Sequence, residues 1–350
     1  MGKYFQELLT IIIPVYNRYD EAIRLYKYFR KYLNRIDIVV LDNSIEINNE
    51  FIKIIESPKT FYKIYISEIT YSEKLFKGIK DFVKTKYSVI CAQDDFITIQ
   101  GLMKSIGFLE KNSEYVICHG KQFRFRNNSN ISKNIIYEEG RGVLSVDNDD
   151  LLDRLRNHIS KYTSTFYAVH RTEILEKIWR YSFEYTDDLR FGELLPSHLS
   201  CVYGKIKALD ILFYLREYSL RSDGHTAKTI NDYFIDNSFH KKYEVYKKCL
   251  IKESRNNDAI DEEKVNKIID ESFQEYLGNS FEIIEMKSAI KRFFNRIKIL
   301  KILFNCYKNY VVMKNRKNEL KSGKIILYLI NNNQSYVDFI RIKNEIETKK

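Results

Sequence analysis

The chain has 350 residues, of which 44% are hydrophobic, and a formal net charge of +11. This length allows one large domain with a smaller one, or two domains, and the apolar content is sufficient for a full core. The five cysteines are widely spaced without a CxxC pair, which argues against a disulfide framework and a cysteine zinc site. Neither a secretory signal nor an apolar run of the ~20 residues that a membrane span needs occurs. These features predict a cytoplasmic protein.

The positive charge is concentrated at the C-terminal end. Residues 281–350 contain 16 Lys+Arg and 6 Asp+Glu, a net of +10, which leaves 42 basic and 41 acidic side chains and a net of +1 for the rest of the chain. This asymmetry indicates a polyanionic partner, either an anionic lipid surface or nucleic acid.

The first part of the chain alternates short apolar runs with helical patterns. The runs predict buried strands at residues 8–14, 36–41, 61–66 and 87–95, separated by helices at 19–33 and 72–84. Pro14 is expected to end the first strand because proline has no N–H to donate. The strand–helix–strand order predicts right-handed crossovers and a parallel sheet. Neither a GxGxxG nor a GxxxxGK[ST] loop occurs, which argues against Rossmann cofactors and P-loop NTP hydrolysis.

The middle of the chain continues the alternation before the pattern turns helical. We expect helices at 102–111, 146–160, 172–179 and 194–203, strands at 115–120, 166–170 and 206–215, and a polar loop at 123–134. Beyond residue 226 the pattern is helical throughout. The sequence therefore predicts an α/β domain over residues 1–228 and a basic α-helical region over residues 229–350.

Two adjacent acids follow the strand that begins at Tyr87. A buried strand does not keep unpaired carboxylates in its interior, so Asp94 and Asp95 are expected at its carboxyl end, where open α/β sheets bind ligands. Carboxylate oxygens at a strand end are suitable ligands for Mg²⁺ or Mn²⁺ carrying phosphates. The alternative is a solvated Asp-Asp turn.

Four segments, in this order, resemble the GT-A nucleotide-sugar glycosyltransferases, in particular the bacterial family-two inverting enzymes. They are residues 10–18 (TIIIPVYNR), 39–44 (VVLDNS), 92–96 (AQDDF) and 191–195 (FGELL). The resemblance covers about residues 8–226 and implies a Rossmann-like, mostly parallel sheet flanked by helices. It departs from the family where Gln93 replaces the first acid of the usual DxD triplet, and where the family's Arg and Asn on the preceding helix give way to lysines.

The resemblance also implies roles for individual residues. Asp95, with Asp94, would hold Mn²⁺ or Mg²⁺, and Glu193 would be the general base, with Asp188 and Asp187 as rival bases. The donor nucleotide would be bound by the first turn, the second strand end, the helix before the acids, Asp94 itself and a C-terminal loop: Pro14, Tyr16, Asn17, Arg18, Asp42, Lys74, Asp94 and His225. Four of these residues also have a structural alternative, which is a turn Asp for Asp42, a solvated lysine for Lys74, a helix N-terminal Glu for Glu193 and a surface-loop histidine for His225.

A basic amphipathic pattern spans residues 288–316. It is consistent with a helix on an anionic membrane surface near a lipid-linked acceptor, and equally with a helix packed on the α/β domain or on a second subunit of a homo-oligomer. A nucleic-acid-binding helix is the third interpretation, but no recognised nucleic-acid motif supports it, so no nucleic-acid partner is expected.

These features together predict a metal-dependent, inverting glycosyltransferase. It would move a sugar from a nucleotide donor, a UDP-sugar in the first instance, to a hydroxyl of a glycan or lipid-linked acceptor in bacterial surface polysaccharide or glycoconjugate synthesis. One alternative is a nucleotidyltransferase on a similar sheet, although that class usually carries a Gly-rich turn after its first strand. The other is a catalytically degenerate scaffold, which Gln93 favours.

Overall fold

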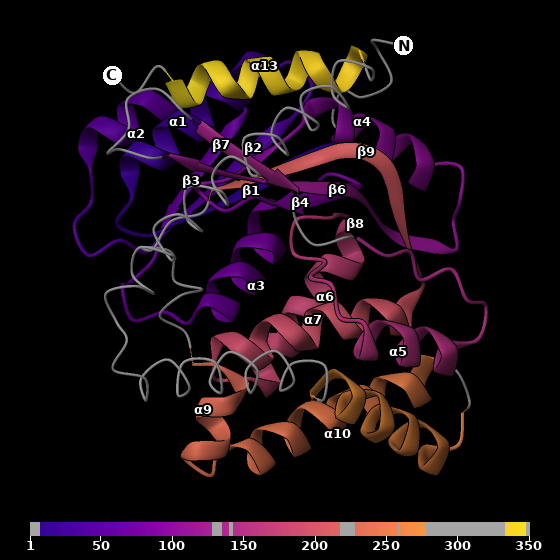
Figure 1. The fold of residues 1–350 in the computed structure, drawn as a ribbon. Coiled ribbons are helices and arrows are strands. Elements are labelled where there is room, and N and C mark those ends of the chain that lie inside the picture. The colour runs from indigo at the N-terminus through magenta and orange to yellow at the C-terminus, as the bar shows by residue number, and fades with distance from the viewer. Residues whose placement is uncertain are drawn as a thin grey trace, which may run out of the picture.

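The computed structural model describes residues 8–127, 135–139, 143–217, 228–257, 260–277 and 333–347. Within these residues a nine-stranded sheet has the order β3-β2-β1-β4-β8-β6-β9-β5, with β7 paired to β6 (Figure 1). The strands are β1 (Leu9–Val15), β2 (Asp37–Asp42), β3 (Thr60–Ile64), β4 (Tyr87–Ile90), β5 (Phe96–Ile97), β6 (Tyr115–Asn127), β7 (Ile135–Glu139), β8 (Val169–Arg171) and β9 (Lys205–Glu217).

The sheet is parallel in one half and mixed in the other. β3, β2, β1 and β4 are mutually parallel, as the strand–helix–strand order predicts. β8 then runs antiparallel to both β4 and β6, while β6 and β9 pair in parallel. The predicted α/β architecture is confirmed, but the pairings among the described strands are divided evenly between parallel and antiparallel.

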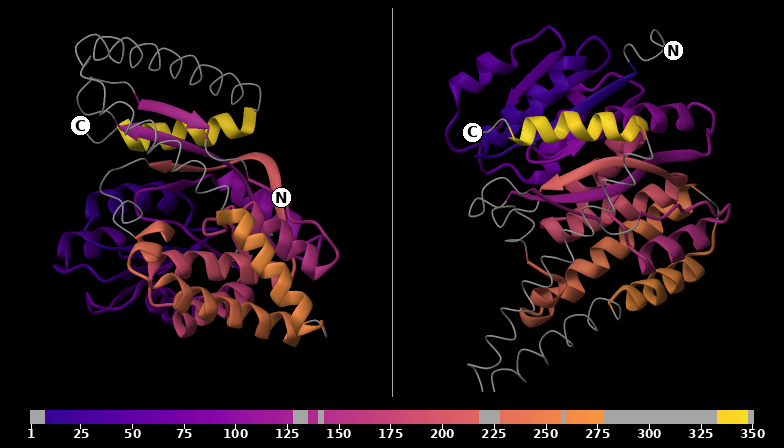
Figure 2. Two further views of the ribbon diagram at one scale, coloured as in Figure 1. Left: turned by 60° about the horizontal axis from the view of Figure 1, so that its bottom comes forward. Right: turned by 45° about the horizontal axis from the view of Figure 1, so that its top comes forward.

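Helices cover both faces of the sheet (Figures 1 and 2). One face packs against α1, α2, α4 and α13, and the other against α3, α5, α6 and α7, with each side forming its own apolar cluster. The bounds are α1 (Tyr19–Phe29), α2 (Asn49–Ile55), α3 (Tyr71–Phe82), α4 (Ile99–Leu109), α5 (Leu151–Ser160), α6 (Thr172–Tyr185), α7 (Leu189–Tyr203), α9 (Ile230–Ile235), α10 (Phe239–Asn257) and α13 (Asn333–Glu347), with a 3₁₀ turn at Arg30–Tyr32.

Several predicted boundaries are wrong, each for a tertiary reason. β1 continues past Pro14 to Val15, because β4 pairs with β1 only as far as Ile12 and so needs no N–H from the proline. β6 extends through the predicted loop to Asn127, because β7 and β9 pair with that polar end on either side. α7 begins at Leu189, because Asp188 caps it, so Glu193 lies inside the helix and not at its start.

The C-terminal helical region packs on both sides of the sheet. Residues of α9, α10 and the helix at 262–277 join the apolar cluster of α6 and α7. α13 instead lies across α1 and α4, where Asp338 accepts a 2.8 Å hydrogen bond from the backbone N–H of Gln100 at the start of α4. The described helices after residue 228 therefore contact both faces of the α/β domain, residues 288–316 lie outside the described part, and the division of the chain at residue 228 stays a prediction. No helix among the described residues is long and apolar enough to cross a membrane.

Candidate active site

The turn after β1 is held by Gln93 from the loop between β4 and β5. The Gln93 side chain accepts a 2.9 Å hydrogen bond from the Tyr16 N–H and donates a 3.0 Å bond to the Tyr16 carbonyl oxygen. A side-chain amide offers one acceptor and two donors, so it can satisfy both groups of a single residue, and a carboxylate cannot. Gln93 therefore joins the two strand ends where the resemblance expects an acid.

Asn17 continues this turn with a left-handed backbone, at φ 51°. Asparagine tolerates this conformation better than most non-glycine residues. Its N–H donates to Ser44 Oγ at 2.9 Å, and its Oδ1 accepts from the Ile45 N–H at 2.9 Å. The turns after β1 and β2 are thus linked to each other, and the Tyr16 ring beside them is 37% exposed.

The two acids of the β4–β5 loop have different partners. Asp94 forms a 2.7 Å ion pair with Arg18. Asp95 is buried; its Oδ1 accepts a 2.7 Å bond from the Glu217 N–H, and its Oδ2 accepts from the Tyr167 hydroxyl. Burial and the neighbouring Asp94 raise the pKa of Asp95 well above its usual range. The predicted position at the end of β4 is confirmed, and the solvated Asp-Asp turn is wrong.

Asp42 and Lys74 are buried beneath the strand ends. Asp42 accepts four hydrogen bonds, from Ser44 N, Ser44 Oγ, Tyr19 OH and Tyr62 OH, at 2.6 to 2.9 Å. Lys74 Nζ reaches from α3 to the carbonyl oxygen of Val15 at 3.2 Å and to the Asn43 side chain. Asp42 therefore joins the end of β2 to α1 and β3, Lys74 joins α3 to the ends of β1 and β2, and neither is a solvated surface residue.

Glu193 lies on the face of the sheet that α7 covers. It is partly buried and accepts a 3.2 Å hydrogen bond from Tyr162 OH. The Arg216 guanidinium, near the end of β9, interacts electrostatically with both Asp95 and Glu193. Arg216 follows Tyr214 at the two-residue spacing that places side chains on one face of a strand. The Tyr214 ring stacks on that of Tyr167, the hydrogen-bond partner of Asp95, with ring centroids 4.4 Å apart. The structure thus brings Asp95 and Glu193, 98 positions apart in the sequence, to one region.

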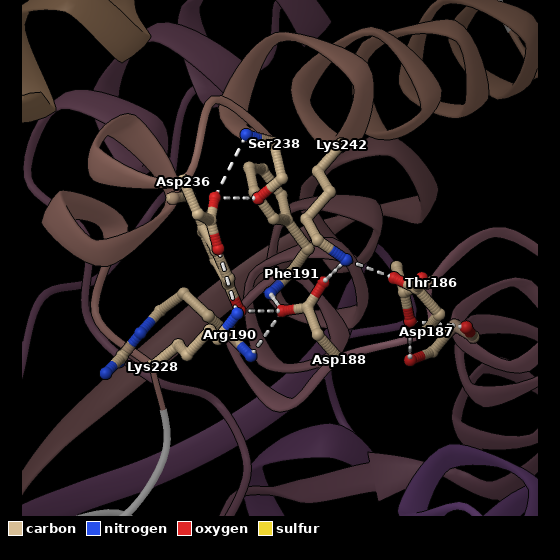
Figure 3. A network of polar contacts seen from close by, with 11 residues as sticks. Thr186, Asp187, Asp188, Arg190, Phe191, Lys228, Asp236, Ser238 and Lys242 are labelled. Carbon is tan, nitrogen blue, oxygen red and sulfur yellow. Dashed lines mark hydrogen bonds and ion pairs between the residues drawn. The ribbon is translucent and has the colours of Figure 1, made fainter.

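The rival bases Asp188 and Asp187 belong to a structural network (Figure 3). Asp188 Oδ1 accepts from the N–H groups of Arg190 and Phe191 at 2.8 and 2.9 Å, and from Tyr233 OH at 2.6 Å. Lys242 from α10 pairs with Asp188 Oδ2 at 3.1 Å and also with Asp187. Asp188 is therefore the N-cap of α7 and the point where α9 and α10 attach to it.

Three residues that the sequence reasoning missed complete the site. Tyr162 donates to Glu193 and Tyr167 donates to Asp95, and Arg216 interacts electrostatically with both carboxylates. None has a local sequence signature, because each acts through a contact across the fold. The extended pattern at 206–215, which Arg216 follows directly, is the one sequence feature that could have pointed to Arg216. Pro14 is buried in β1 and Tyr16, Asn17 and Arg18 lie at its end, while His225 lies outside the described residues.

Comparisons with known proteins address the fold. No protein-family model matches the chain, and no curated protein matches it. Among solved structures, S. aureus TarS 1-349 in complex with UDP-GlcNAc matches with a TM-score of 0.50 and 17% identity, covering 77% of this chain and 73% of that one. TarS 1-349 without a named ligand matches with a TM-score of 0.48 and 14% identity over 98% of this chain and 92% of that one. The chain therefore shares the fold of the TarS 1-349 complex, and the GT-A fold class predicted from its sequence is confirmed.

Proposed function

We propose that this protein is a glycosyltransferase that moves a sugar from a nucleotide-sugar donor to a hydroxyl of a glycan or lipid-linked acceptor. The observation that carries the proposal is the convergence of Asp95, at the end of β4, and Glu193, on α7, around the exposed Arg216. This edge of a parallel sheet is where open α/β folds bind ligands. The likeness to a structure that holds UDP-GlcNAc supports a UDP-sugar as the first donor to test.

In this proposal the donor lies over the linked turns after β1 and β2. The exposed Tyr16 ring offers a stacking face for the base, and Arg18, already paired with Asp94, offers a cation beside the phosphates. Asp42 and Lys74 are buried at the ends of these strands and hold them in place through their hydrogen bonds. A direct contact of either one with the donor stays a prediction, because Asp42 has all its acceptor positions filled by protein donors.

Glu193 is the proposed general base. It would accept the proton of the acceptor hydroxyl while the hydroxyl oxygen bonds to the anomeric carbon and the bond from that carbon to the nucleoside diphosphate breaks. A positioned base contributes about 10²–10⁴-fold to such a step. Attack on the side opposite the leaving group inverts the anomeric configuration, which is the stereochemistry that we propose. Tyr162 orients the carboxylate through its hydroxyl.

A divalent metal at Asp94 and Asp95 stays a prediction. Carboxylates suit Mn²⁺ or Mg²⁺ chemically, but Asp94 is paired with Arg18 and both Asp95 oxygens accept protein hydrogen bonds. No group of three His, Cys, Asp or Glu side chains among the described residues is arranged to hold a metal. As arranged, these residues do not form a ready ligand set, and no step of the proposed mechanism depends on a metal.

The scaffold alternative rests on Gln93, and its side chain has a structural task here because it holds Tyr16. A thermal-shift panel of nucleoside diphosphates, each with and without Mn²⁺, tests both the scaffold alternative and the metal, since a ligand that binds the native state raises its stability. We expect UDP to raise Tm, and a further rise with Mn²⁺ would establish the metal. No shift with any nucleotide, together with no release of UDP from UDP-GlcNAc, would contradict the proposed function.

Membrane association and homo-oligomerisation also stay predictions. Both depend on the basic segment 288–316, which lies outside the described residues. Flotation of the full chain with liposomes containing an anionic lipid, compared with neutral liposomes, tests the first. Light scattering of the chain in solution tests the second.

A further inference from the structure

Two arginines face the same way on neighbouring strands at this end of the sheet. Arg124 on β6 is the register partner of Arg216 on β9, and the two strands run in parallel, side by side (Figure 1). Register partners on adjacent strands project from the same face of the sheet, with backbones about 4.8 Å apart. Arg24 of α1 lies over the Phe125 ring and forms an ion pair with Glu217, so the residues that follow the two arginines point to the α1 side. Side chains alternate along a strand, so Arg124 and Arg216 point to the α7 side, where Arg216 interacts electrostatically with Glu193.

Neither arginine has a hydrogen bond or ion pair with a side chain that the structure describes. Arg124 is half-buried and its Nε has no partner. Arg216 is exposed and interacts electrostatically with the carboxylates of Asp95 and Glu193. Gln122, two residues before Arg124 on the same face, is buried, and its amide Nε2 also lacks a partner. Buried donors are paired in most native structures, so the two buried donor atoms without acceptors, Arg124 Nε and Gln122 Nε2, beside the exposed Arg216 call for an explanation.

Two adjacent guanidinium groups repel each other unless an anion lies between them. Arginine binds phosphate with two parallel hydrogen bonds, which a pair of guanidinium groups and an amide can extend to several oxygens. We propose that Arg124 and Arg216, with Gln122, form a binding site for a phosphate-class anion beside the two carboxylates. This inference rests on the proposed function, because the anion is then either the diphosphate of the donor or a phosphate carried by the acceptor.

Isothermal titration of the full-length protein in chloride buffer tests the site with three probes, which are pyrophosphate, inorganic phosphate and UDP. The variants are Arg216→Met, Arg124→Met and, as matched control, Arg156→Met, which removes an exposed arginine of α5 that pairs with Asp153. Each of the first two should weaken pyrophosphate binding about tenfold or more, because each removes charged hydrogen bonds. The control should bind as the wild type does.

The probes also separate the two sources of the anion. If the site holds the donor diphosphate, Arg216→Met weakens UDP binding while uridine binding is unchanged. If it holds an acceptor phosphate, UDP binds normally to Arg216→Met, and inorganic phosphate binds the UDP-saturated wild type but not the variant.

Absence of phosphate and pyrophosphate binding by the wild type, or equal binding by both arginine variants and the control, would overturn the inference. UDP release from UDP-GlcNAc tests the proposed function separately, so one can fail while the other stands. Should Arg124→Met not fold, the exposed Arg216 alone decides the result.

Discussion

The sharpest prediction concerns which carboxylate near the start of α7 performs chemistry. Asp188→Ala removes the acceptor of two helix N–H groups and of the buried Tyr233 hydroxyl. Loss of an N-cap costs about 1 kcal/mol, and a buried hydroxyl left without an acceptor costs about 1–3 kcal/mol. We therefore expect Asp188→Ala to lower the free energy of unfolding by about 2–4 kcal/mol, measured from the midpoint of urea unfolding.

The matched substitution Asp188→Asn separates capping from catalysis. Asparagine caps helices as well as aspartate does, and its carbonyl oxygen can keep the same three hydrogen bonds. It loses the pair with Lys242, which is partly exposed and contributes about 0–1 kcal/mol. A capping residue predicts near-normal stability and near-normal activity for this variant, whereas a general base predicts a loss of about 100-fold or more.

Glu193→Gln is the companion variant. The amide oxygen can still accept from Tyr162, so the fold should be unchanged, while release of UDP from UDP-GlcNAc should fall by about 10²–10⁴-fold. The assignment is refuted if Asp188→Asn loses activity while Glu193→Gln keeps it. An unaltered unfolding midpoint for Asp188→Ala would refute the capping argument.

Three further predictions concern stability. Asp95→Asn should stabilise the protein at neutral pH, because folding raises the pKa of this buried carboxyl. Such a group stabilises the native state fully below its unfolded pKa and loses that contribution as pH rises through the folded pKa, and each pKa unit corresponds to about 1.4 kcal/mol. Equal Tm values for variant and wild type from pH 5 to 8 would contradict this prediction. Burial lowers the pKa of His158 to about 4 and that of His119 to about 3. The stability that these histidines contribute should therefore be full above pH 6.5 and fall as pH drops toward these values, and replacing His158 by Gln should reduce the loss of stability between pH 6 and 4 in urea titrations. Asp338→Ala should cost about 1–2 kcal/mol because the Gln100 N–H loses its acceptor, and unchanged hydrogen exchange at the start of α4 would show that α13 does not cap it.

The parallel direction of the first four strands could be predicted from the sequence because it is encoded locally. Apolar runs of strand length separated by amphipathic helices fix β1, β2, β3 and β4, and the preference for right-handed crossovers makes them parallel. The position of Asp95 at a strand end follows from the same reasoning, since an interior strand position would leave the carboxylate unpaired.

The roles of the polar residues could not be read in this way. Asp188 and Glu193 are both acids near one helix start, and only the positions of Tyr233, Lys242 and Tyr162 distinguish a cap from a candidate base. Gln93 looks like a lost acid until its contact with Tyr16 is known. The extent of β6 likewise depends on strands that pair with its polar end.

The sequence by itself determined the fold class, the parallel half of the sheet and the edge at which the acids lie, because burial and backbone hydrogen bonding constrain these within short segments. The tertiary structure alone decided which acid is a cap and which faces the site, and it alone placed Arg124 beside Arg216. Hydrogen bonds and charge interactions between residues dozens of positions apart depend on side-chain geometry, and no local pattern of residue types specifies that geometry.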